Sequence, residues 1–171
     1  MNVVASIELM VLCFVAALFV WAATTDFRSF QIPNRISVSL VALYPAFLLA
    51  GPTTPNWQLA GIAAAFAMIV FVVGFGMFVM GWMGGGDVKL LSATALWAGP
   101  GAILPFLIVV VLASMLLSLV IAVRTLTEQS VPLREAVVGL RFAPLMKLTV
   151  PYGAAIAVGG LYVVGRLAMT A

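Results

Sequence analysis

The chain has 171 residues, of which 65% are hydrophobic and 8% are charged, and it contains no histidine. Its mean hydropathy is +1.26, whereas soluble domains are about half apolar and about a quarter charged. This composition predicts an integral membrane protein, and without histidine a serine or cysteine nucleophile lacks its usual base. The single cysteine, Cys13, excludes a disulfide framework and a cysteine zinc site.

Apolar stretches separated by turn or charge signals are expected to cross the membrane as helices, since one crossing takes roughly 20 residues. They are residues 3–23, 36–50, 58–82, 88–98, 102–123 and 148–167. The second reaches spanning length if residues 32–35 begin the helix, and Gly99-Pro100-Gly101 separates the fourth from the fifth. The sequence therefore predicts an all-α, polytopic membrane protein with about six transmembrane helices, built as a single domain over residues 1–171.

The connection between the fifth and sixth stretches, residues 124–147, is the longest. Ser130 and Pro132 can start a helix there, and Leu133 and Leu140 belong to one apolar stripe at helical spacing. We expect a short cytoplasmic interfacial helix, with a plain solvated loop as the alternative.

The basic residues predict the orientation of the chain in the membrane. Those in or beside the first, third and fifth connections are Arg28, Arg35, Lys89, Arg124, Arg134, Arg141 and Lys147. By the positive-inside rule this side is cytoplasmic, which places the N-terminus outside, and Arg166 near the other interface is the exception. The net charge of +3 is therefore attributed to topology and not to nucleic-acid binding, because the basic residues are spread over loops.

The two aspartates are the first candidates for chemistry. Asp26 and Asp87 are the only aspartates in the chain, and each lies where an apolar segment meets a short charged loop. Pro33 and Asn34 can start the second helix, so Asp26 lies between two helix ends. The glycines at 84–86 allow another backbone or a substrate to approach Asp87 closely.

A single carboxylate at a helix end is usually a cap or an arginine partner. The dipole of a helix also stabilises a negative charge at its start, which alone could explain Asp87. Ionisable groups at membrane depth are costly, however, and are commonly kept for function. Two carboxylates held together share a proton, which provides one base and one acid for water-mediated peptide hydrolysis. We therefore interpret Asp26 and Asp87 as a reacting pair.

Three segments resemble the motifs of one family. Residues 84–89, with the sequence GGGDVK, are similar to the GxGDxK signature of prepilin peptidases, which are intramembrane aspartic proteases. Asp26 followed by Ile32-Pro33-Asn34 resembles their first catalytic motif. Residues 150–157, VPYGAAIA, resemble the (I/V)PYGxAIA segment of a late helix. The three segments occur in the family's order.

The resemblance implies that Asp26 and Asp87 are catalytic and bind one water, without a metal or a cofactor. It implies prepilin substrates with a short basic leader ending in glycine and a hydrophobic helix, cleaved at the cytoplasmic face of the bacterial inner membrane among membrane lipids. The supporting or substrate-binding residues are expected to be Pro33, Asn34, Gly84, Gly86, Lys89, Pro151, Tyr152 and Gly153. Lys89 could equally be a lysine that sets topology or meets lipid headgroups. Pro151 to Gly153 are expected to bend the sixth helix toward the site.

The chain resembles the short Flp/Tad-type (CpaA/TadV-like) prepilin peptidases, because it has no CxxC motif and no long loop before the third stretch. No separate cytoplasmic zinc or methyltransferase insert is therefore expected. One alternative is a preflagellin or presenilin-like GxGD protease, which the PYG segment and the absence of a PAL motif disfavour. Another is a small transporter or assembly subunit that uses the aspartates as ion or proton sites, which would need a polar path across the membrane.

Overall fold

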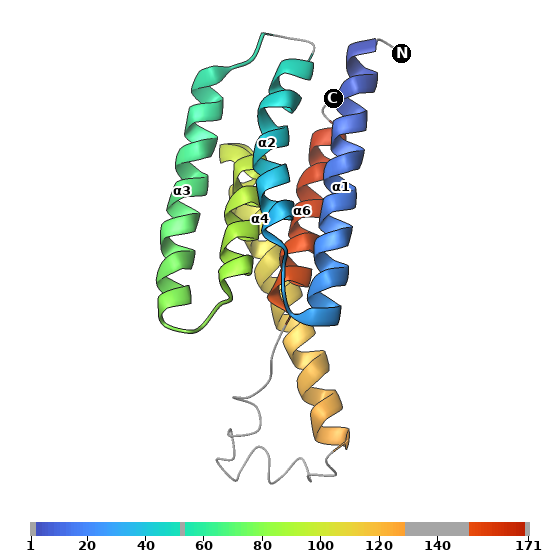
Figure 1. Cartoon of the computed structure of the whole chain (residues 1–171), viewed down its shortest axis with the longest axis vertical. Coiled ribbons are helices and arrows are strands. Elements are labelled where there is room, and N and C mark those ends of the chain that lie inside the picture. The colour runs from blue at the N-terminus through green and yellow to red at the C-terminus, as the bar shows by residue number, and fades with distance from the viewer. Residues whose placement is uncertain (1–2, 52–53, 129–150, 170–171) are drawn as a thin grey trace.

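The computed structural model describes residues 3–51, 54–128 and 151–169, and the secondary structure in these residues is helical (Figure 1). The helices are α1 (Val3–Ser29), α2 (Asn34–Ala50), α3 (Trp57–Val79), α4 (Gly85–Glu128) and α6 (Tyr152–Ala168). The predicted all-α class is confirmed for this part of the chain. The interfacial helix expected near residues 130–140 lies outside the described residues.

Three helical segments are long and apolar enough to cross a membrane: Ser6–Ser29, Trp57–Val79 and Gly85–Thr125. The segments Asn34–Ala50 and Tyr152–Ala168 are shorter apolar helices. The protein is therefore an α-helical membrane protein. By length and composition, the described helices do not reach the six crossings that the sequence predicted.

One reason is that residues 88–98 and 102–123, predicted as separate helices, both belong to α4, which has a kink at Gly99. Gly99 has φ 56° and ψ −174°, a conformation that residues with a Cβ rarely adopt, and Pro100 follows it. Figure 1 shows the chain reversing direction there, because the green first part rises beside α3 and the yellow-to-orange second part returns. The predicted break at Gly99 is therefore present as a reversal within α4.

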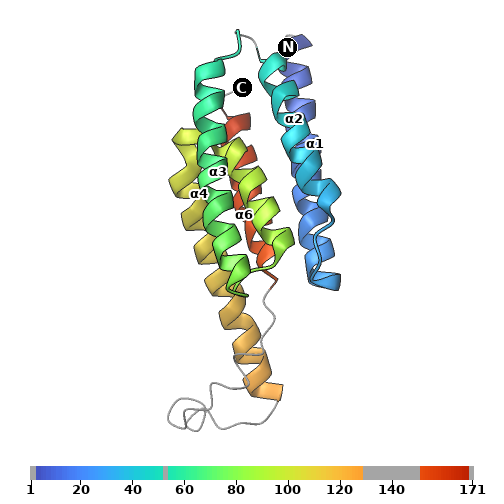
Figure 2. The same cartoon turned by 60° about the vertical axis from the view of Figure 1, so that its left-hand side comes forward.

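The turn between α1 and α2, the turn between α3 and α4, and the start of α6 lie at one end of the molecule, which we call the site end (Figures 1 and 2). The two chain termini lie at the opposite end, and the second part of α4 continues past the site end. The three segments that carry the sequence motifs are therefore brought to the same end of the bundle.

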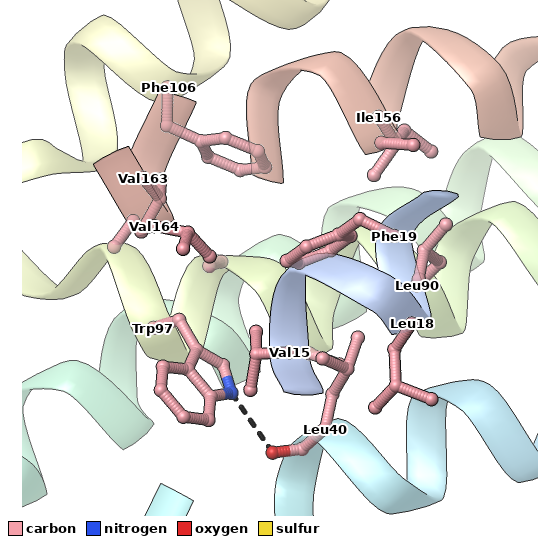
Figure 3. Packing of buried hydrophobic residues seen from close by; sticks show 14 of the residues in the cluster. Val15, Leu18, Phe19, Leu40, Leu90, Trp97, Phe106, Ile156, Val163 and Val164 are labelled. Carbon is pink, nitrogen blue, oxygen red and sulfur yellow. Dashed lines mark hydrogen bonds between the residues drawn. The ribbon is translucent and has the colours of Figure 1, made fainter. Parts of the chain in front are cut away.

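The core forms where α1, α2, α4 and α6 meet, and Phe19, Phe106 and Ile156 are fully buried in it (Figure 3). Trp97 Nε1 donates a hydrogen bond of 2.9 Å to the carbonyl of Leu40 and so joins α4 to α2. On α6, a Cβ at Gly160 would overlap the Phe19 ring. Small residues at such a position let two membrane helices approach closely.

Candidate active site

Asp26 lies in the last turn of α1, and only 3% of the residue is exposed. The N–H of Ala154 donates a 2.9 Å hydrogen bond to Asp26 Oδ2, and the N–H of Gly153 also bonds to this carboxyl. Both donors belong to the first turn of α6, where backbone N–H groups have no partner within the helix. Asp26 therefore caps α6 across 128 residues of chain, and the positive end of that helix favours a negative charge.

Gly153 makes this contact possible. A Cβ at this position would overlap Ile32 Cδ1 and would lie 2.9 Å from Asp26 Oδ2 and 3.0 Å from Asp26 Cγ. Pro151 directly precedes α6, so our prediction that residues 151–153 bend the sixth helix is wrong for the described residues. Proline lacks an N–H and suits a helix start, where that donor would have no partner within the helix.

The chain turns sharply after Asp26. Phe30 has a positive φ of 51°, and its N–H donates a 2.9 Å hydrogen bond to the Asp26 carbonyl. This left-handed helix cap is usually made by glycine, because other residues carry a steric penalty in that conformation. It ends α1 one turn after Asp26 and directs the chain toward Ile32.

Asp87 lies in the first turn of α4 and is partly buried. The N–H of Gly84 bonds to its carboxyl, and a Cβ at Gly84 would lie 2.9 Å from Asp87 Oδ2. A negative charge at this position is stabilised by the helix dipole of α4. The carboxyls of Asp26 and Asp87 are close enough for their charges to interact.

Ile32 joins the three motif segments. A Cβ at Gly86 would lie 3.3 Å from Ile32 Cβ, and a Cβ at Gly153 would overlap Ile32 Cδ1. Ile32 therefore occupies the space left by one glycine near Asp87 and by another near Asp26. We did not predict it as a site residue, because an isoleucine in so apolar a chain gives no signal beyond its place before Pro33.

A family model described as the type IV leader peptidase family matches residues 13–123. This match covers most of the chain and includes Asp26, Ile32 and Asp87. The chain belongs to the type IV leader peptidase family. The family predicted from the motifs is therefore confirmed. Comparison with curated proteins and with solved structures gave no match.

In this member of the type IV leader peptidase family, the remaining predicted residues also lie at the site end. Lys89 Nζ donates a 2.9 Å hydrogen bond to Asn34 Oδ1, which links the start of α4 to the start of α2, and both residues are exposed. Pro33 precedes α2, as predicted, and the partly buried Tyr152 is the first residue of α6. The arrangement can therefore hold two carboxyls together beside three helix starts.

Proposed function

We propose that this type IV leader peptidase family member hydrolyses the peptide bond after the leader glycine of Flp-type prepilins, using Asp26 and Asp87. The proposal is carried by one observation. The two aspartates of the chain come from different helices and lie at the site end, close enough for their charges to interact. Asp26 accepts backbone N–H bonds from Ala154 and Gly153, and Asp87 accepts one from Gly84.

In the proposed reaction the two carboxyls share one proton and bind one water. The ionised carboxylate takes a proton from the water as the water oxygen attacks the scissile carbonyl carbon, and the protonated partner hydrogen-bonds to the carbonyl oxygen. The C–N bond then breaks, and a carboxyl donates a proton to the leaving amine. Atoms and charges balance with water as the only co-reactant.

We also propose that the aspartates face the cytoplasm of a bacterium, in its inner membrane, with six crossings if the two parts of α4 are counted separately. Arg28, Arg35 and Lys89 belong to the ends of α1, α2 and α4 that lie at the site end, and Arg124 belongs to the part of α4 that continues past it, whereas Arg166 is in the last turn of α6. The positive-inside rule then places the site end in the cytoplasm and the N-terminus outside. We treat residues 1–171 as one peptidase domain.

Ion or proton transport is the alternative, and it needs polar groups along a path across the membrane. The other acidic residue of α1, Glu8, is buried and lies about 27 Å from Asp26 along the helix, at 1.5 Å per residue. Between these two acids, the buried face of α1 carries the apolar residues Leu12, Val15 and Phe19. This observation favours hydrolysis at one end over transport through the bundle.

The test is the processing of a co-expressed Flp-type prepilin, followed as a gel shift. Asp26→Asn and Asp87→Asn should each abolish processing while leaving the amount of protein in the membrane unchanged, because either change removes the shared proton. Glu8→Gln is the matched control, since it removes a buried carboxyl from α1 far from the site, and it should process normally. Normal processing by either aspartate variant would refute the pair, an equal loss in Glu8→Gln would show that the loss is not specific to the site, and a wild type that processes nothing would favour transport.

A further inference from the structure

A groove of about 690 Å³ lies between α2, α3 and α4. The helices α2 and α3 both pack on α4, and the groove lies between residues 34–42 of α2 and residues 64–71 of α3. Its polar lining residues gather at the site end and are Asn34, Ser37, Lys89 and Ser92. The rest of its lining is apolar, from Val38 on α2 to Leu96 on α4.

The shape of the groove fits another helix. On α2 its lining runs from Asn34 to Ala42, which is about 12 Å at 1.5 Å per residue, or about two helical turns. Alanines at positions 42, 64, 67 and 93 line it, so all three helices present small side chains to it. Small residues at such positions allow close approach of a further helix in a membrane.

Ser37 lines the groove, and its hydroxyl has no hydrogen-bond partner among the described residues. The residue is only 6% exposed. Buried polar atoms are nearly always hydrogen-bonded, so such a hydroxyl marks a place where a further partner fits. Because Ser37 lines the groove, rotation about its χ1 can turn the hydroxyl toward an occupant.

We propose that the groove holds the first two turns of the substrate's apolar helix, directly after the scissile bond, with Ser37 bonding to a backbone group at the polar end. The identity of this helix rests on the proposed function. The polar end includes Asn34 and Lys89 at the starts of α2 and α4, so an occupant that enters there lies at the same end of the bundle as the two aspartates. The apolar remainder, lined by small side chains on all three helices, matches a helix embedded in the membrane.

Two neighbouring alanines of α3 provide a matched pair of variants. Ala64 and Ala65 are both exposed, but only Ala64 lines the groove. Ala64→Phe should lower kcat/KM for a full-length Flp-type prepilin by about tenfold, mainly through a higher KM, because the ring occupies the groove. Ala65→Phe should leave kcat/KM within about twofold of wild type, because its ring points away from the groove. Both variants should cleave a soluble leader peptide that ends shortly after the scissile bond at the wild-type rate.

Crosslinking tests the same groove without relying on cleavage. In the Asp87→Asn protein, a photoreactive amino acid at position 64 should crosslink to the uncleaved prepilin, and one at position 65 should not. Equal crosslinking at both positions, crosslinking to lipid alone, or equal kinetics of the two phenylalanine variants would overturn the groove assignment. If the wild type cleaves no prepilin while crosslinking stays confined to position 64, the proposed hydrolysis fails and the docking groove stands.

Discussion

Replacing Gly153 with alanine should damage the site while leaving the fold intact. The new Cβ would lie 2.9 Å from Asp26 Oδ2 and 3.0 Å from Asp26 Cγ. The carboxyl must then move by about 0.5 Å to reach ordinary contact distance. The overlap with Ile32 Cδ1 is easier to relieve, because this atom is the far end of a flexible side chain. The strain of the substitution therefore falls on Asp26.

The expected loss in kcat/KM follows from the hydrogen bond that the movement of the Asp26 carboxyl disturbs. Asp26 Oδ2 accepts a 2.9 Å bond from the N–H of Ala154, and a hydrogen bond to a charged group contributes about 1.5–3 kcal/mol. If this bond is lost in the transition state, kcat/KM should fall by about 10- to 100-fold, since 1.36 kcal/mol corresponds to tenfold. Alanine also suits a helix better than glycine by about 0.5–1 kcal/mol, so the free energy of unfolding should fall by only about 1–2 kcal/mol.

The measurement is cleavage of a purified prepilin in detergent, with thermal unfolding followed on the same samples. Gly165→Ala is the control, because it lies on the same helix and its Cβ would have no heavy atom within 4 Å. It should cleave at the wild-type rate. In Gly160→Ala the new Cβ would overlap the Phe19 ring, which lies away from the site. This variant should therefore have a clearly lower Tm but a cleavage rate close to that of wild type. If Gly153→Ala cleaves as fast as Gly165→Ala, α6 does not confine the Asp26 carboxyl and the reasoning is refuted.

Two further predictions concern the scaffold of the site. Trp97→Phe should lower the free energy of unfolding by about 1–2 kcal/mol, because it keeps an aromatic ring but removes the 2.9 Å bond to the Leu40 carbonyl; an unchanged Tm in detergent would contradict this. Gly99→Ala should lower the free energy of unfolding by about 1–3 kcal/mol, since φ 56° and ψ −174° strain any residue with a Cβ. Gly101→Ala, with nothing within 4 Å of its Cβ, is the control, and equal losses in the two variants would show that the kink is not the cause.

Helix boundaries were predicted less well than the places where the chain turns. The first stretch was expected to end at residue 23, but α1 continues to Ser29. The polar residues that suggested an end satisfy their hydroxyls within the helix, since Thr24 Oγ1 donates to the Trp21 carbonyl at 2.8 Å and Thr25 Oγ1 to the Ala22 carbonyl at 3.0 Å. Hydropathy alone therefore ended the helix too early, whereas the proline before Asn34 located the start of α2 correctly.

The meeting of the three motif segments at one end could be predicted, because charges, glycines and prolines stand out in so apolar a chain. The contacts that hold them together could not. A carboxyl that caps a helix 128 residues away follows no local spacing, and neither does the packing of Ile32 against Gly86 and Gly153. Such contacts depend on the tertiary arrangement of α1, α4 and α6. The sequence therefore indicated which residues gather and left open how each is positioned.

The backbone groups around Asp26 and Asp87 explain how two carboxylates can lie close to each other in an apolar bundle. Each carboxyl meets a different helix start, because Asp26 accepts bonds from the first turn of α6 and Asp87 lies in the first turn of α4. Backbone dipoles thus offset part of the repulsion and of the cost of burial. The cation nearest to Asp87 in sequence, Lys89, bonds to Asn34 instead. Within the residues that the structure describes, compensation by the backbone leaves both carboxyls available to share a proton, which supports their proposed roles as acid and base.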